Sequence, residues 1–251
     1  MHNLSGKIYF ASDCHFGVPT KVASAKREKL FISWLDEVKS DANYIILLGD
    51  IFDFWFEYKY VVPRGHTRLL GKFAELSDLG IKFIYFTGNH DFWIRDYFAE
   101  EFGFEIIRKP TVFIINQKKV FIGHGDGLGP KDSSYKLMKS VFEAPINRWL
   151  YARLHPNFAF WLAGKVSSGS RAANGDNDEK FHGEEREWLI QFARKKLETE
   201  HFDYFIFGHR HLPLTIELNE KSTYINTGEW IKSFSYAHSE EDNIVLTKFV
   251  K

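Results

Sequence analysis

Five short polar clusters, each placed directly after a run of apolar residues, constrain the fold of this chain more than any other feature. The apolar runs have the length of buried β-strands, and the clusters combine aspartate, asparagine and histidine, most of them with glycine. The clusters are Asp-Cys-His at 13–15, Gly-Asp-Ile-Phe-Asp at 49–53, Gly-Asn-His-Asp at 88–91, Gly-His-Gly-Asp at 123–126 and Gly-His-Arg-His at 208–211. Polar side chains at several strand ends predict one site along one edge of a sheet.

The first third of the chain is predicted to alternate between strands and helices. Apolar residues recur at helical spacing over 26–39 and again over 67–79, where Gly80 ends the helix. The continuous apolar runs 8–11, 44–48 and 81–86 are typical of strands covered on both faces. This βαβαβ order favours a mainly parallel sheet with helices on both faces.

The pattern changes after residue 91. A hairpin is expected from strands 111–115 and 119–122, followed much later by a helix over 183–198 and a strand over 204–207. Segments 214–218, 223–225 and 244–250 are predicted to close the chain as antiparallel strands. Together these elements predict a layered α/β protein with two sheets, built as a single domain over 1–251 with a helical insert at 130–180.

Composition excludes several classes of function. Lys plus Arg and Asp plus Glu are equal at 33 each, so no overall charge favours nucleic acid as a partner. Cys14 is the single cysteine, which excludes an internal disulfide. No apolar run approaches the ~18 residues of a membrane span, and the first residues lack the apolar core of a signal peptide. We therefore expect a cytoplasmic protein.

The insert has an unusual composition. It is strongly apolar at helical spacing, and between 131 and 171 it carries seven Lys or Arg against two acidic residues. Two interpretations are open. The apolar side chains pack onto the rest of the domain, or they form a surface for a lipid, with the basic residues favouring an anionic bilayer.

The residue types in the clusters predict a metal centre. Carboxylate, amide and imidazole donors suit Mn²⁺, Zn²⁺ or Fe²⁺, and a carboxylate such as Asp50 can bridge two ions. His90 would stay free to stabilise phosphoryl charge or protonate a leaving group, and Asp91 would orient a neighbouring histidine. Turn or capping roles are equally open for Asp53 and Asp126. One ion is assigned to Asp13, His15, Asp50 and His211, and the other to Asp50, Asn89, His124 and His209.

In this combination and order the clusters resemble the calcineurin-like metallophosphoesterase superfamily, whose motifs match from 13–15 through 208–211. The resemblance implies a four-layer α/β/β/α sandwich with an inserted helical cap and a dinuclear centre, with Mn²⁺ favoured. It also implies hydrolysis of a phosphoester or phosphoanhydride by metal-bound hydroxide, with His90 as general acid or transition-state contact. Asn89 and His90 would both also touch the substrate.

The stretch from Gly123 into the insert is similar to the UDP-2,3-diacylglucosamine diphosphatases of lipid A synthesis. This resemblance implies a lipid-linked nucleotide-sugar substrate, cleaved to 2,3-diacylglucosamine 1-phosphate (lipid X) and UMP by an enzyme peripheral on the inner membrane. Many members of that family carry arginine where this chain has His90. Substrate contacts are implied for Asp132, Tyr135, Ser170, Asn174 and Lys180.

Other functions remain open at this point. A phosphoesterase or nucleotide pyrophosphatase with a water-soluble substrate would need the same metal ligands. A non-catalytic scaffold of the same fold is disfavoured by the complete set of ligands. Nucleic-acid cleavage is disfavoured because the positive charge lies on an apolar insert and not in a broad polar groove. No oligomeric state is predicted.

Overall fold

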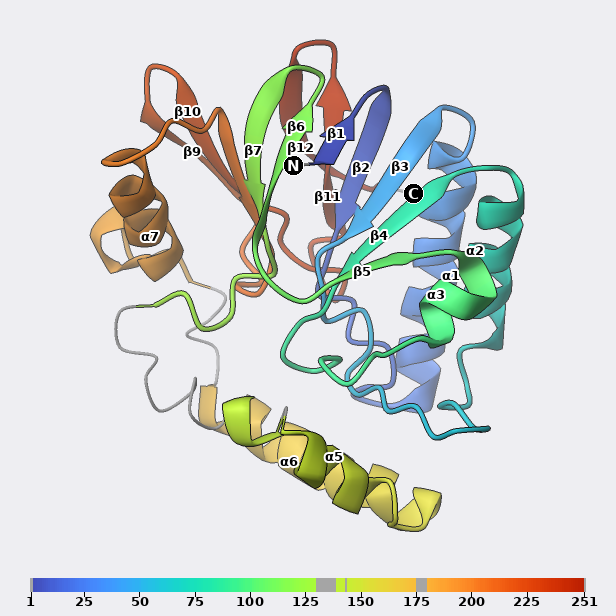
Figure 1. Cartoon of the computed structure of the whole chain (residues 1–251). Helices are drawn as coiled ribbons and strands as arrows, with labels where there is room; N and C mark the ends of the chain where they lie inside the picture. The colour runs from blue at the N-terminus through green and yellow to red at the C-terminus, as the bar shows by residue number, and fades with distance from the viewer. Residues whose placement is uncertain (1, 130–138, 143, 175–179, 251) are drawn as a thin grey trace.

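A computed structural model of the chain describes residues 2–129, 139–142, 144–174 and 180–250, of which 166–174 are described by their backbone alone. Within these residues the strands form two six-stranded sheets that face each other (Figure 1). The first has the order β1-β6-β7-β8-β10-β9 and the second the order β12-β11-β2-β3-β4-β5.

The second sheet contains the strands that open the chain. β2 (Lys7–Ala11), β3 (Ala42–Leu47), β4 (Lys82–Phe86) and β5 (Glu105–Ile107) are parallel, and β11 (Ser235–Glu240) and β12 (Asn243–Lys248) complete it as antiparallel strands. Its outer face is covered by α1 (Lys21–Val38), α2 (Thr67–Asp78) and α3 (Tyr97–Phe102). α1 begins where Thr20 accepts a hydrogen bond from the Ala23 backbone N–H (3.2 Å).

The first sheet mixes both pairings. β1 (His2–Leu4), β6 (Thr111–Ile115), β7 (Lys118–Ile122), β8 (Tyr204–Phe207), β9 (Leu214–Asn219) and β10 (Ser222–Asn226) form it. The predicted hairpin is β6 and β7, and β7 pairs with β8 in parallel. β10 is antiparallel to β9 but parallel to β8, so the expected run of antiparallel strands at the end of the chain is only partly correct. α7 (Trp188–Leu197) packs on the outer face of this sheet.

The inner faces of the two sheets make one apolar core. Phe10, Ile46 and Ile84 of one sheet are buried against Phe113 and Ile206 of the other. The expectation of helices on both faces of the parallel sheet was therefore wrong. A continuous apolar run reports that a strand is covered on both faces but does not say by what. The layers are α/β/β/α, as the resemblance implied.

The helix predicted over 183–198 is shorter in the structure. A 3-10 turn at Glu184–Arg186 precedes α7, and Glu187 between them is extended (φ −84°, ψ 97°). The carboxylate of Glu187 receives two hydrogen bonds of 2.9 Å from Arg210, a contact between distant segments that no local pattern reveals. The strand β11 was not predicted, because its sequence, Ser-Tyr-Ala-His-Ser-Glu, shows little of the alternation between apolar and polar residues that indicates a strand.

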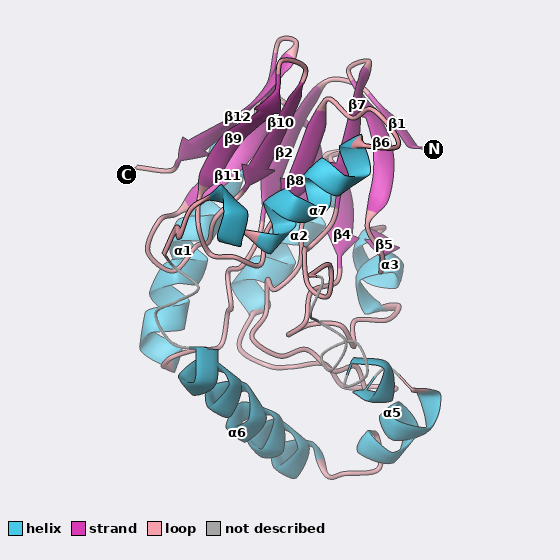
Figure 2. Ribbon diagram, turned by 90° about the vertical axis from the view of Figure 1, so that its left-hand side faces the viewer, coloured by secondary structure: helices cyan, strands magenta, loops and turns pink. Residues whose placement is uncertain are grey.

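The helices of the insert lie beyond one end of the sandwich (Figures 1 and 2). They are α5 (Pro145–Tyr151) and α6 (Pro156–Asn174), and we call the segment 130–180 the cap. Aromatic rings join it to the sandwich: Tyr151 lies 4.6 Å from Trp93 and 4.7 Å from Phe56 between ring centroids, and Phe160 lies 5.4 Å from Phe54. The cap therefore rests on the two loops that follow Asp53 and Asp91.

Much of the remaining apolar surface of the cap is open to solvent. Trp149 is 52% exposed and Trp161 57%, while Ala159 and Ala163 on the opposite side of α6 are buried. Only part of the cap therefore follows the interpretation in which its apolar residues pack onto the domain. Among the described residues, no helix is long and apolar enough to cross a membrane.

Candidate metal centre

All five polar clusters lie at the same end of the sandwich, after β2, β3, β4, β7 and β8. Their backbones are unusual, because several non-glycine residues adopt left-handed conformations that cost free energy and are retained mainly at functional sites. These residues are Asp13 (φ 53°), His15 (φ 45°), Asp50 (φ 53°), His209 (φ 67°) and His211 (φ 49°).

Two glycines of the motifs are required by close approach of aspartate side chains. A Cβ on Gly88 would lie 2.1 Å from Asp50 Oδ1, and one on Gly208 would lie 2.5 Å from Asp13 Oδ2. No side chain fits at such distances. Gly88 and Gly208, which precede Asn89 and His209, thus allow a carboxylate from a neighbouring loop to reach the centre.

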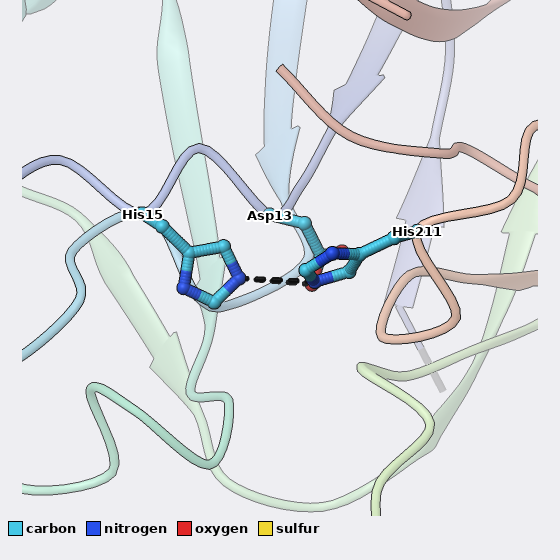
Figure 3. Close-up of side chains that lie close together, drawn as sticks. All are labelled: Asp13, His15 and His211. Carbon is cyan, nitrogen blue, oxygen red and sulfur yellow. Dashed lines mark hydrogen bonds and ion pairs between the residues drawn. The ribbon is translucent and has the colours of Figure 1, made fainter. Parts of the chain in front are cut away.

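The first group of side chains contains Asp13, His15 and His211 (Figure 3). His15 Nε2 lies 3.0 Å from His211 Nε2, and His211 Nε2 lies 3.2 Å from Asp13 Oδ1. All three predicted ligands of this group therefore meet, although His211 lies 196 residues after His15 in the chain.

The second group contains Asp50, His124 and His209. His124 Nε2 lies 3.1 Å from Asn89 Oδ1, 3.2 Å from His209 Nδ1 and 3.4 Å from Asp50 Oδ2. The same Asp50 oxygen lies 3.8 Å from His15 Nε2 of the first group. Asp50 is thus placed between the two groups, the position that a bridging carboxylate requires.

The hydrogen bonding of these residues is evidence, independent of the sequence motifs, that they suit divalent ions. Asp13 Oδ1 is buried and, among the described residues, accepts no hydrogen bond, although the imidazoles of His15 and His211 lie within 4 Å of it. Atoms facing away from the centre are satisfied instead: His124 Nδ1 lies 2.7 Å from the Leu48 carbonyl, and Asp13 Oδ2 accepts from the His209 backbone N–H (2.8 Å). Such outer contacts orient metal ligands.

Burial and charge act against each other in the centre. Burial opposes ionisation of Asp13 and Asp50, but the neighbouring histidines outweigh it and hold the pKa of both carboxyls well below the usual range. Burial likewise opposes protonation of His15 and His124, yet the surrounding carboxylates raise the pKa of each to about 10. The centre therefore has strong electrostatic demand for positive charge, which protons or metal ions can meet.

His90 lies beside the first group and is held by Asp53. Its Nδ1 is 3.0 Å from the Asp53 carbonyl and 3.6 Å from Asp53 Oδ1, and its ring meets His15 edge-on at 4.7 Å. Burial lowers the pKa of His90. A turn role, which the sequence left open for Asp53, does not by itself explain its position, since its side chain is buried next to His15 and His90.

Among the described residues, the hydrogen bonds to the Asp91 carboxylate come from groups other than the histidine that it was expected to orient. Its Oδ1 accepts from the Gly88 N–H (2.8 Å), and its Oδ2 accepts from the Ile51 N–H (2.9 Å) and the Tyr85 hydroxyl (2.5 Å). Burial, together with the charge of Asp50, raises the pKa of Asp91 to about 6. Asp91 therefore joins the loop after β3 to the loop after β4, because its side chain points back into the sandwich.

We expect Asp91→Asn to lower the free energy of unfolding by about 3 kcal/mol. The amide NH₂ would replace one acceptor oxygen and face a buried donor, and an unsatisfied buried donor costs roughly 1–3 kcal/mol in addition to the lost charged hydrogen bond. Urea denaturation measures the change. Asp78→Asn, at an exposed position at the end of α2, should stay within about 0.5 kcal/mol of the parent.

Sequence reasoning missed several residues that support the centre. Arg210, between the two histidines of the last cluster, forms the buried bidentate pair with Glu187 described above. Lys139 of the cap pairs with Asp126 at 2.6 Å, and the side chain of Asp126 is buried near His124. Asp126 thus ties the cap to the centre. The spacing of charged residues in the sequence contains no signal for either pair, since both partners come from separate segments.

The predicted substrate contacts lie mostly beyond what the structure describes. Asp132 and Tyr135 are outside the described residues. Ser170 and Asn174 belong to α6, where only the backbone is described. Lys180 lies between α6 and α7 with an exposed side chain. These five contacts remain predictions.

Known proteins resemble this chain over most of its length. The model of the calcineurin-like phosphoesterase family matches residues 6–213. A UDP-2,3-diacylglucosamine hydrolase of Porphyromonas gingivalis is 36% identical and covers 97% of both chains. One from Proteus mirabilis is 28% identical over 87% of this chain and 90% of its own. Vacuolar protein sorting 29 from Cryptosporidium parvum, a solved structure, matches at a TM-score of 0.44 with 13% identity, over 98% of this chain and 99% of its own.

The match to the family model ends two residues after His211 and therefore includes every cluster that forms the two ligand groups. The donor set and the α/β/β/α layers agree with it. The chain belongs to the calcineurin-like phosphoesterase family of metal-dependent hydrolases.

Proposed function

We propose that this protein hydrolyses the pyrophosphate bond of UDP-2,3-diacylglucosamine, releasing 2,3-diacylglucosamine 1-phosphate (lipid X) and UMP. The observation that carries the proposal is the 36% identity to the P. gingivalis UDP-2,3-diacylglucosamine hydrolase along nearly the whole of both chains, cap included. The cap packs on the loops that follow Asp53 and Asp91, and its exposed apolar side chains support a substrate that is partly lipid.

Two divalent ions, for which we favour Mn²⁺ over Zn²⁺ and Fe²⁺, are assigned to the two ligand groups. Asp13, His15 and His211 would hold the first ion, His124, His209 and Asn89 the second, and Asp50 would touch both. When bound, such a pair polarises a phosphoryl group and lowers the pKa of water. The protein's own contribution is to fix the ligands, with His124 held by the Leu48 carbonyl and Asp50 by the His90 N–H (2.8 Å).

His90 is assigned to the phosphoryl group. Its Nδ1 faces Asp53, so Nε2 is the nitrogen left to contact a phosphoryl oxygen or to pass a proton to the leaving oxygen. Its side chain is 14% exposed, against 4% for that of His15, as a group that meets substrate requires. Asn89, a ligand of the second ion, lies next to it in the chain and would share the contact.

The remaining contacts are assigned to the cap. Asp132, Tyr135, Ser170, Asn174 and Lys180 would hold the glucosamine and its phosphate. The apolar helices would bind the acyl chains, each CH₂ contributing ~0.8 kcal/mol when buried.

The exposed apolar surface of the cap supports a cytoplasmic protein that associates peripherally with the inner leaflet of the inner membrane. Trp149 and Trp161 are more than half exposed, and the guanidinium of Arg153 lies 4.5 Å from the Trp149 ring. Aromatic rings with adjacent cations are suited to the boundary between acyl chains and anionic head groups.

The test is release of UMP from the diacylated substrate in detergent, compared with hydrolysis of unacylated UDP-sugars and of simple phosphodiesters. We expect the acylated substrate to be turned over with a much higher kcat/KM. Equal or faster turnover of the unacylated compounds would contradict the lipid substrate and would favour a phosphoesterase acting on a soluble compound. The presence of His90 where many diphosphatases carry arginine is the observation that favours this second candidate.

Trp161→Glu should weaken binding to vesicles that contain anionic lipid by about tenfold or more. Transfer of a large apolar side chain out of water contributes roughly 1.5–3 kcal/mol, and the substitution also adds a repelled charge. Sedimentation with vesicles measures the change. Leu79→Glu, at a similarly exposed position (64%) at the end of α2, is the matched control and should bind as the parent does. An equal loss in both variants would argue against docking through the cap.

A further inference from the structure

A buried arginine on α1 is hydrogen-bonded to the loop that carries the first two predicted ligands, Asp13 and His15. Arg27 is 7% exposed, and its guanidinium donates to three backbone carbonyls of residues 14–18. We propose that Arg27 is a positioning residue that sets His15 in the geometry needed to hold the first metal ion. The inference rests on the two-ion function proposed above.

The three hydrogen bonds surround His15. Nε of Arg27 donates to the Cys14 carbonyl (2.8 Å), and one terminal nitrogen donates to the His15 carbonyl (2.7 Å) and the Val18 carbonyl (2.6 Å). The Cys14 and His15 carbonyls belong to the peptide groups on the two sides of the His15 Cα. Arg27 therefore fixes both peptide planes whose relative rotation sets the direction of the imidazole.

That rotation is one a histidine rarely adopts. His15 has φ +45°, in the left-handed region, so its backbone is strained unless the surroundings hold it. On the side away from Arg27, the N–H of His15 donates to the Asp50 carbonyl (2.9 Å) and that of Phe16 to the Ile51 carbonyl (2.9 Å). The loop is thus held between α1 and the next ligand loop, which leaves His15 Nε2 3.0 Å from His211 Nε2.

The choice of arginine indicates a specific role. Burial of a charge is costly and lowers the pKa of the Arg27 guanidinium, and in the described part of the chain its hydrogen-bond acceptors are backbone carbonyls and not carboxylates. An apolar side chain would avoid the cost of burying a charge but would leave the three carbonyls without this donor. The planar fork of arginine can bond several carbonyls at once, which the single ammonium group of lysine cannot do in the same geometry.

Ser24 provides an internal control. It lies one turn earlier on α1, is 5% exposed and accepts a hydrogen bond from the Gly17 N–H (2.7 Å). It therefore holds the same loop from the same helix but contacts neither peptide group of His15. Loss of Ser24 should loosen the loop without redirecting the ligand.

The experiment is a titration of metal-free protein with Mn²⁺, followed by electron paramagnetic resonance and calorimetry, for the parent and for Arg27→Lys, Arg27→Gln and Ser24→Ala. Arg27→Lys keeps the positive charge and Arg27→Gln removes it. An effect that both variants share is therefore due to loss of the planar guanidinium and not to loss of charge. Both Arg27 variants should bind one of the two ions about 10–100-fold more weakly, the range typical for residues that orient ligands, and the other ion within about twofold. Ser24→Ala should lower the melting temperature while both affinities stay unchanged.

The possible results separate the two proposals. If the parent binds two ions and the folded Arg27 variants bind both as tightly as the parent, the role of Arg27 is refuted and the proposed function stands. The same holds if Ser24→Ala weakens the same ion as strongly, because general loosening of the loop then explains the effect. A parent that binds fewer than two ions would refute the two-ion assignment and the inference with it.

Discussion

Asp50→Asn should prevent the protein from binding two metal ions at once and should lower kcat by about a thousandfold or more. Asp50 lies between the two ligand groups, 3.4 Å from His124 Nε2 and 3.8 Å from His15 Nε2. Metal ions stabilise transition-state charge by several kcal/mol, and each 1.36 kcal/mol corresponds to a factor of ten in rate. Elemental analysis of the purified protein and the rate of UMP release measure the two effects.

The asparagine variant tests the ligand role with little change in shape. It keeps an oxygen that can accept from the His90 N–H, a contact of 2.8 Å in the parent. Asp78→Asn, on the surface of α2, should leave metal content and rate unchanged. A full complement of two ions in Asp50→Asn would contradict the dinuclear centre. Two ions with no activity even in the parent would instead indicate a scaffold without catalytic function.

His90→Ala should lower kcat by about 10²–10⁴-fold while both metal ions stay bound. This is the range for loss of a general acid or base. His90 lies outside the two ligand groups, where Asp53 holds it, although His15, Asp53 and His90 form a third cluster with the spacing of metal ligands. Metal content and kcat, measured on the same preparation, separate loss of chemistry from loss of the centre. A decrease in metal content would show that His90 is a ligand after all.

His90→Arg is the informative companion variant. Arginine is the residue that many of the similar diphosphatases carry here, and its planar fork suits a phosphoryl group. If His90 contacts the phosphoryl group mainly through charge and hydrogen bonding, the arginine variant should recover much of the rate lost in the alanine variant. If it passes a proton to the leaving oxygen, arginine should not restore the rate, because its pKa is too high for proton transfer near neutral pH.

Local patterns predicted much of the sandwich. β2, β3, β4, β6, β7 and β8 lie within two residues of their expected positions, because each is an apolar run bounded by turn residues. β1, β5, β11 and α3 were not predicted. All four are short or polar, and two of the strands depend on pairing with segments far away in the chain, β1 with β6 and β11 with β2.

The candidate site divides in the same way. The sequence by itself determined which residues converge, because Asp, Asn and His directly after buried strands must meet where the strands end. It did not determine what holds them. The supporting contacts are Arg27 with the His15 carbonyl, Arg210 with Glu187, Lys139 with Asp126, and Asp91 with the Ile51 N–H. Each joins two different segments, 12 to 40 residues apart in the chain. Such contacts depend on the packing of whole layers and leave no periodic signal, so only the tertiary structure decided them.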